Sequence, residues 1–163
     1  MSAADNIDVI VESAQWDALP DAQAVARNAI AQALAALNGR ADAELAVLLT
    51  DDAAVRRLNA TWRGLDKPTN VLSFPAAEAP EPHHLGDIAI AFETTVREAK
   101  DEGKPLADHL AHLAVHGFLH LVGYDHESDA DAETMEQLER DILARLNVPD
   151  PYLAPTSAEA TGV

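Results

Sequence analysis

The chain has 163 residues, and 48% of them are hydrophobic, which is enough for one compact domain with a sizeable core. It contains no cysteine, so disulfides and thiolate metal sites are excluded, and any transition metal must be held by nitrogen and oxygen atoms. Its formal net charge of -17 argues against general attraction to nucleic acid or to an anionic membrane.

The first half of the chain alternates between strand and helix patterns. Alternating polar and apolar residues predict a strand over 7–16, and alanine-rich helical spacing predicts a helix over 21–37. The short apolar run 44–50 predicts a buried strand. A helix is expected over 53–63, behind the capping oxygens of Thr50, Asp51 and Asp52, and a strand over 70–74.

The second half begins with a proline-rich loop, 76–85, which is followed by a predicted strand over 86–91. Helices are predicted over 92–102 and 105–121, and a last helix starts at Ser128. These elements predict a single domain over residues 1–148, in which a mixed, twisted β-sheet is packed with about five helices. Residues 149–163 are rich in Pro, Ala, Ser and Thr and are expected to form a flexible tail.

No apolar run approaches the length needed to cross a bilayer. The first residues, MSAADNIDVIVES, lack the basic start and the apolar stretch of a secretion signal. We therefore expect a cytoplasmic protein with no membrane partner.

Three histidines stand at the end of the helix predicted over 105–121. His116 and His120 are one turn apart, so both can bind one metal ion, and Gly123 can end the helix in a left-handed conformation that turns His126 back toward that ion. Three imidazoles leave a fourth position open for water, which is typical of a catalytic zinc site. The same ligands also suit nickel or copper.

The spacing H-x-x-x-H-x-x-G-x-x-H matches the metal-binding helix of metzincin proteases, with one difference. Those enzymes carry Glu directly after the first His as the general base, whereas this chain has Gly117. The pattern therefore predicts a metzincin-like metal-binding helix without the proteolytic base. A base from elsewhere, such as Asp125, remains an alternative.

Other polar residues near the three histidines have an ordinary structural explanation. His109 and His112 extend the same helical stripe, and we expect ordinary helix residues there, with a supporting or direct metal contact as the alternative. Glu127 fits the acidic first turn of the following helix. Asp125 could orient an imidazole or carry a proton.

Three blocks of the sequence resemble one protein family. The segment HGFLHLVGYDH at 116–126 is similar to the signature of the YbeY endoribonucleases. The segment LNATWRGLDKPTNVLSFP at 58–75 resembles a second family block, and Gly86-Asp87-Ile88 resembles a third. The blocks occur in the family's order, and their joint occurrence is highly specific.

The resemblance implies a single α+β domain that binds one Zn²⁺ ion per chain through His116, His120 and His126. It also implies that Arg63 acts beside the metal, and His116 and Arg63 are the expected catalytic residues. Four of the 11 basic residues, namely Arg56, Arg57, Arg63 and Lys67, lie within residues 56–67, so a basic patch can exist on an acidic protein.

The implied function is single-strand-specific, zinc-dependent cleavage in 16S rRNA 3′-end maturation and ribosome quality control. Expected partners are a single-stranded rRNA segment, the small ribosomal subunit and ribosomal proteins, but not DNA. Zinc and Arg63 would together hold the scissile phosphate. Two alternatives remain: a zinc peptidase-like hydrolase, and a non-enzymatic ribosome assembly factor that is stabilised by metal.

Overall fold

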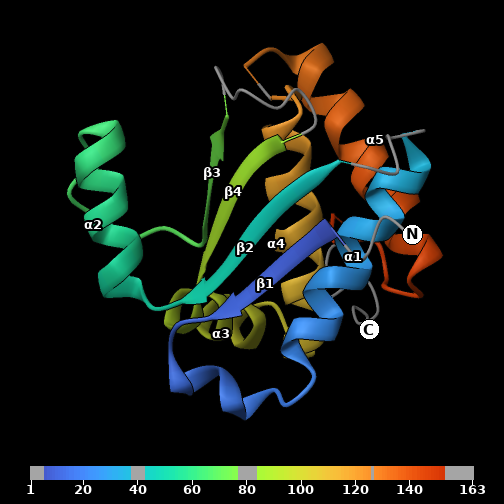
Figure 1. Cartoon of the computed structure of the whole chain (residues 1–163). Coiled ribbons are helices and arrows are strands. Elements are labelled where there is room, and N and C mark those ends of the chain that lie inside the picture. The colour runs from blue at the N-terminus through green and yellow to red at the C-terminus, as the bar shows by residue number, and fades with distance from the viewer. Residues whose placement is uncertain (1–5, 38–42, 77–83, 126, 153–163) are drawn as a thin grey trace.

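A computed structural model describes residues 6–37, 43–76, 84–125 and 127–152 (Figure 1). The described elements are, in chain order, β1 (Ile7–Val11), a short 3-10 helix (Ala14–Ala18), α1 (Ala22–Ala36), β2 (Glu44–Thr50), α2 (Asp52–Arg63), β3 (Val71–Pro75), β4 (His84–Ala91), α3 (Phe92–Asp101), α4 (Leu106–Leu121) and α5 (Asp129–Arg145). Within these residues, the prediction of an α+β fold with five α-helices and a mixed sheet is confirmed.

The sheet has four strands in the order β1-β2-β4-β3. Strands β1, β2 and β4 are parallel, whereas β3 pairs antiparallel with β4, for example Ser73 opposite Ile88. The parallel pair β1 and β2 requires a crossover, which α1 provides. In this order β3 is an edge strand, and residues 64–70 connect α2 to it.

The two faces of the sheet bury different sets of side chains, as the alternation along a strand requires. Figure 1 shows α1, α4 and α5 together on one side of the sheet and α2 apart from them. The larger core includes Leu45, Val47, Leu49, Ile88 and Ile90 of the sheet together with side chains of α1, α4 and α5. A smaller core packs Val55 of α2 against Leu72, Ala89 and Ala91.

Two segments differ from the expected pattern. The first strand ends at Val11 and not at residue 16, because Trp16 turns inward on the 3-10 helix and its indole N–H donates to the carbonyl oxygen of Thr50 at 2.9 Å. Residues 149–152 of the expected tail pack on the domain, where Asp150 pairs with Arg140 at 3.0 Å. Residues 153–163 lie outside the described part of the chain.

Among the described residues, no helix has both the length and the apolar character that a membrane crossing requires.

Candidate metal centre and catalytic site

Helix α4 carries a stripe of four histidines, namely His109, His112, His116 and His120. The rings of His116 and His120 lie closest together, with centroids 4.7 Å apart and planes inclined by 76°. The rings of His112 and His116 are 6.2 Å apart. The predicted pair therefore lies side by side at the C-terminal end of α4.

The end of α4 is shaped by two glycines. Gly123 has a φ of 105°, and the backbone N–H of Tyr124 donates to the carbonyl oxygen of Leu119 at 2.9 Å, so the chain turns directly after the helix. Gly117 faces the sheet: a Cβ atom there would lie 2.9 Å from Ile88 Cγ2 and 3.0 Å from Val71 Cγ2. The position of the metzincin base is thus packed against strands, with no room for a glutamate.

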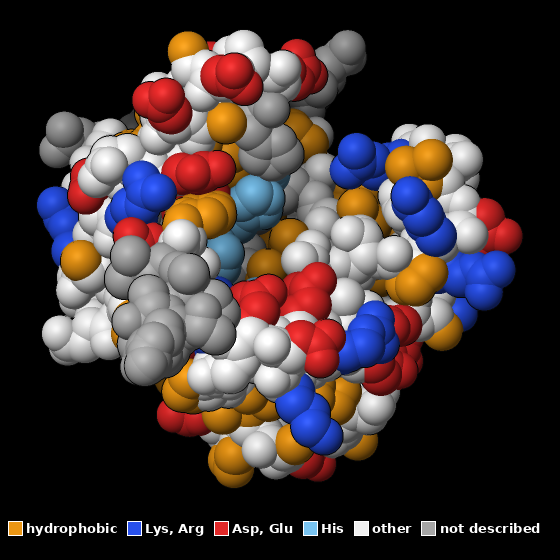
Figure 2. Space-filling view, turned by 180° about the vertical axis from the view of Figure 1, so that it is seen from behind, with side chains coloured by type: hydrophobic (Ala, Val, Ile, Leu, Met, Phe, Trp, Pro, Cys, Tyr) orange, Lys and Arg blue, Asp and Glu red, His pale blue; other side chains and the backbone are white. Residues whose placement is uncertain are grey.

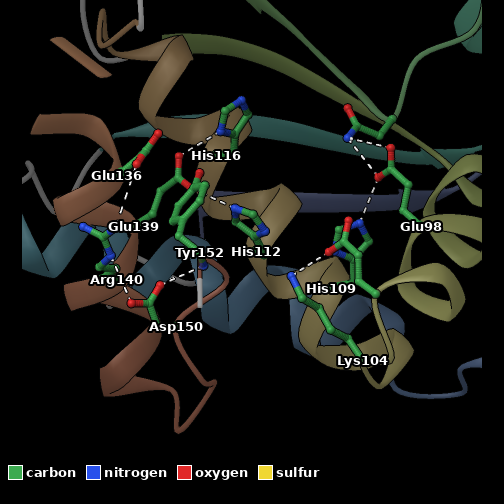
Figure 3. Close-up of polar contacts among 12 residues, drawn as sticks. Glu98, Lys104, His109, His112, His116, Glu136, Glu139, Arg140, Asp150 and Tyr152 are labelled. Carbon is green, nitrogen blue, oxygen red and sulfur yellow. Dashed lines mark hydrogen bonds and ion pairs between the residues drawn. The ribbon is translucent and has the colours of Figure 1, made fainter. Parts of the chain in front are cut away.

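A buried carboxylate of α5 lies against the histidine stripe (Figure 3). Glu139 has no exposed surface. Its Oε2 lies 2.8 Å from His116 Nδ1, and its Oε1 lies 2.8 Å from His112 Nε2. Burial raises the pKa of this carboxyl, but the hydrogen bonds from His112 and His116 lower it more, and the resulting pKa is about 2.

The ionised Glu139 decides which nitrogen of His116 is available to a metal. A carboxylate without a proton only accepts hydrogen bonds, so His116 must donate from Nδ1. In the neutral ring Nε2 then carries the lone pair, which is the form of imidazole that binds a metal. Glu139 therefore selects the tautomer and the ring orientation of His116.

The segment after α5 completes the surroundings of Glu139. The hydroxyl of Tyr152 donates a short hydrogen bond to Glu139 Oε1, and its ring lies edge-on to His112 with centroids 5.7 Å apart. Arg140 lies over the same ring and pairs with Asp150. Burial and the contact with Glu139 raise the pKa of the Tyr152 hydroxyl, so it stays protonated and acts as a donor.

His112, His116 and Glu139 form a group that could hold a metal ion, since one ligand atom of each lies within 4.8 Å of the others. Two ligands of one tetrahedral zinc lie about 3.3 Å apart, given metal–ligand distances of about 2.0–2.1 Å. The two contacts of Glu139 are 2.8 Å and have hydrogen-bond length. This distance favours Glu139 as a support of the histidines over a direct ligand.

His109 belongs to a second network further along α4. Only 3% of His109 is exposed, and its Nε2 lies 2.9 Å from Glu98 Oε1, a carboxylate that also accepts from the Asn70 amide at 3.0 Å. Burial lowers the pKa of His109 despite the contact with Glu98. These contacts join α4 to α3 and to the start of β3.

A cavity of about 630 Å³ runs along this face of α4. His109, His112 and His116 lie in its wall, together with Lys104 and Tyr152. Four carboxylates also line it, namely Glu98, Glu102, Asp108 and Asp150. The cavity therefore reaches the candidate metal centre but has an acidic lining.

The structure brings together only part of the predicted site. His126 lies outside the described residues. Arg63 is the last residue of α2, and its exposed side chain forms no ion pair with the described part of the chain. Asp125 accepts a hydrogen bond from the backbone N–H of Glu127 at 3.2 Å, which is a local turn contact.

Sequence reasoning did not identify Glu139 or Tyr152. The signal for Glu139 was a carboxylate inside the apolar face of α5, where Met135, Ile142 and Leu143 are buried with it. Charged residues are rarely fully buried without partners, so this position pointed to a polar site. Tyr152 lies in a proline-rich segment, and no periodicity of the sequence marked it.

Known proteins match this chain over most of its length. The family described as "Endoribonuclease YbeY" matches residues 10–147. A protein of Rhodopseudomonas palustris named "Endoribonuclease YbeY" is 64% identical over 152 residues, which cover 89% of this chain and 88% of the relative. A protein of Bradyrhizobium diazoefficiens with the same name is 57% identical over 153 residues. The match covers 89% of this chain and 84% of that relative.

A solved structure supports the fold alone. The solution structure of a Thermotoga maritima protein is similar with a TM-score of 0.51 and 24% sequence identity. The match covers 90% of this chain and 99% of that protein.

Proposed function

The chain belongs to the YbeY family of endoribonucleases, and on this basis we propose that it cleaves single-stranded RNA with one zinc ion held by His116, His120 and His126. The observation that carries the metal proposal is the contact between His116 Nδ1 and Glu139 Oε2 at 2.8 Å, because it favours the tautomer whose Nε2 can bind a metal. His120 lies beside it on the same face of α4.

The donor set fits zinc, because neutral imidazoles and an absence of thiolates suit a catalytic site with an open position. A bound zinc ion would supply a water of lowered pKa or a Lewis acid for a phosphoryl oxygen. Around it, Glu139 would hold the ring of His116, while His112 and Tyr152 donate to Glu139. These residues position a ligand and take no direct part in cleavage.

Arg63 is proposed as the residue that binds the scissile phosphate. A guanidinium can pair with two phosphate oxygens and stabilise the charge that develops on them. Arg63 lies at the exposed C-terminal end of α2, where its guanidinium can reach a substrate. It follows that His116 and Arg63 act from two elements, α4 and α2.

The proposed substrate is the 3′ end of 16S rRNA within the small ribosomal subunit, in maturation and in quality control. The acidic surface of the protein, with a net charge of -17, suits contact with basic ribosomal proteins.

The test pairs metal analysis with mapping of rRNA 3′ ends in cells that carry either the unaltered protein or His116→Ala. We expect the variant to lose bound zinc and to leave extended 16S ends. Unchanged ends would exclude cleavage at this site and would support an assembly factor that uses metal for stability only.

A second variant separates Arg63 from the metal. Arg63→Ala is expected to keep one zinc ion per chain and its thermal unfolding temperature but to lose RNA cleavage. Loss of zinc or of the fold in this variant would refute the assigned role.

The structure gives no support to the peptidase alternative, because Gly117 leaves no space for the metzincin base. Degradation of a mixed peptide library by the zinc-loaded protein, abolished in His120→Ala, would revive it.

A further inference from the structure

The C-terminal end of α2 exposes an unusual combination of side chains. Trp62 is 70% exposed and Leu65 is 43% exposed. A single exposed apolar residue is ordinary on a protein surface. A tryptophan is different, because its large ring gains much from burial, and the other tryptophan of this chain, Trp16, is only 1% exposed.

Basic residues gather beside Trp62, although acidic residues outnumber basic ones 28 to 11 in the chain. Arg63 and Lys67 form no side-chain ion pair with any residue that the structure describes, and neither does Arg57 one and a half turns earlier. Arg56 is different, since its guanidinium pairs with Asp66 at 2.8 Å. We call the group Trp62, Arg63, Leu65 and Lys67 the α2 platform.

The backbone under the α2 platform is held by hydrogen bonds at both ends of α2. Residue Asn59, which is buried, donates from its amide to the carbonyl oxygen of Lys67 at 2.9 Å, and Gly64 ends the helix with a φ of 70°. At the other end of α2, the backbone N–H of Asp52 donates to Glu93 at 2.9 Å, and Asp52 accepts from Thr94 at 3.0 Å. Because the backbone is fixed in this way, the ordering cost of binding falls on the side chains alone.

Strand β3 connects the α2 platform to α4, the helix that carries the histidines. The chain runs from Lys67 into β3, and β3 contacts α4 where the Ser73 hydroxyl donates to the carbonyl oxygen of Gly117 at 2.7 Å. Figure 2 shows Lys and Arg side chains gathered over the lobe that contains α2, across a hollow from the histidine side chains. The cavity on the histidine side has carboxylates in its wall, which repel phosphate.

We propose that the α2 platform binds single-stranded RNA: Trp62 stacks on a base, Lys67 contacts a phosphate beside that base, and Arg63 keeps the scissile phosphate assigned to it above. An aromatic face beside cations is the combination that binds single strands, since bases stack on the ring while the cations follow the backbone. The proposal rests on the proposed RNA substrate, and it assigns that substrate a path over α2 toward α4.

The two tryptophans give a direct test. Binding of a short 2′-O-methyl RNA to the full chain is followed by tryptophan fluorescence and by anisotropy of a dye on the RNA. We expect RNA to quench the unaltered protein strongly but not Trp62→Phe, in which only the buried Trp16 remains. Equal quenching of both proteins would overturn the proposal.

Affinity measurements separate stacking from charge. Trp62→Leu should bind roughly 5- to 150-fold more weakly, which is the range for the loss of one stacked base, whereas Trp62→Phe keeps an aromatic face and should stay closer to the unaltered protein. An abasic strand with the same phosphates should bind the unaltered protein and Trp62→Leu equally. If Trp62→Leu binds intact RNA as tightly as the unaltered protein, Trp62 is not a stacking residue.

The phosphate contacts have a matched control. Lys67→Ala should reduce the slope of log affinity against log salt by about 0.7, as expected for one lost contact to a single strand. Arg145→Ala removes a cation at the far end of α5 and should leave the slope unchanged. Equal slopes for Lys67→Ala and the unaltered protein would remove Lys67 from the platform.

Failure of this inference can be distinguished from failure of the proposed function. Cleavage that depends on His116, together with unchanged RNA affinity in Trp62→Leu, would reject the platform and retain the nuclease. Loss of affinity in Trp62→Leu without RNA cleavage by any form of the protein would retain the platform and reject the nuclease.

Discussion

Glu139 links the histidine stripe of α4 to α5 and to the segment after it. It is a fully buried carboxylate that accepts from His112, His116 and Tyr152, and these three donors come from α4 and from the segment after α5. Breaking such a buried network costs more than the loss of one surface hydrogen bond, because the remaining polar groups stay unsatisfied. The orientation of His116 thus depends on a residue 23 positions away in the sequence.

Replacing Glu139 tests its role in orienting His116. Glu139→Gln keeps the size of the side chain, but its amide nitrogen cannot accept a hydrogen bond, so one histidine loses its partner. We expect zinc affinity to fall about 10- to 100-fold, measured by competition with a zinc chelator. Glu136→Gln, which changes a partly exposed carboxylate of the same helix, is the control and should bind zinc normally. Unchanged affinity in Glu139→Gln would show that His116 is oriented without it.

At the scale of elements, the close approach of α4 to the sheet decides where the histidines lie. Gly117 permits this approach, because its Cα faces Val71 of β3 and Ile88 of β4 without an intervening side chain. The Ser73 hydroxyl adds a hydrogen bond from β3 to the helix backbone. The glycine that removes the protease base is therefore also a packing residue.

Gly117→Ala should destabilise the fold although alanine favours helices. The new Cβ atom would lie 2.9–3.0 Å from two methyl groups, and overpacking of this kind costs about 1–3 kcal/mol. Urea unfolding measures the loss. Val71→Ala removes one of the two contacts, so the double variant should lose less than the sum of the single variants. Strict additivity would show that the two residues do not meet.

His109 links α4 to α3 and predicts how stability depends on pH. The groups that face it are Glu98, Glu102 and His112, and burial lowers its pKa below 6.5 in the folded state. Below pH 6.5 the unfolded chain binds a proton at His109 more readily than the folded chain does. The contribution of His109 to the free energy of unfolding is therefore full above pH 6.5. It is lost as the pH falls toward the lower pKa of the folded state.

Unfolding free energies of the protein and of His109→Gln, measured above and below pH 6.5, test this linkage. The protein should lose more stability than the variant as the pH falls. The same pH dependence in both would assign the effect to other groups.

At the scale of the whole molecule, charge and metal binding act in opposite senses on folding. A net charge of -17 favours solubility but adds repulsion within the compact state. A cation that binds the folded chain and not the unfolded chain offsets part of this cost. The proposed zinc site joins α4 to the turn that follows it, so metal binding should also stabilise the fold.

Zinc at about 100 times its dissociation constant should add about 2.7 kcal/mol to the stability of the folded protein. The expected result is a rise of several degrees in Tm, measured by calorimetry with and without a chelator, and little rise in His120→Ala. A full rise in His120→Ala would place the ion elsewhere, for example in the group of His112, His116 and Glu139.

Local patterns in the sequence were sufficient for most of the elements. Strand 44–50 was predicted with the bounds of β2, and the helix predicted over 53–63 corresponds to α2, where Asp51 caps by accepting from the N–H of Ala54 at 2.8 Å. Such features depend on neighbours in the chain, so the sequence shows them. The strand predicted to reach residue 16 was too long, since Trp16 turns inward to reach Thr50, and this contact is not local.

For the candidate site, the sequence by itself determined the histidine stripe, the glycine in place of the metzincin glutamate and the family. His116 and His120 lie side by side because one helical turn separates them. Only the tertiary structure brought Glu139 and Tyr152 to His112 and His116, and only it showed why no side chain fits at Gly117. The physical reason is range: helical spacing acts over a few residues, whereas a buried carboxylate finds its partners through packing between segments far apart in the chain.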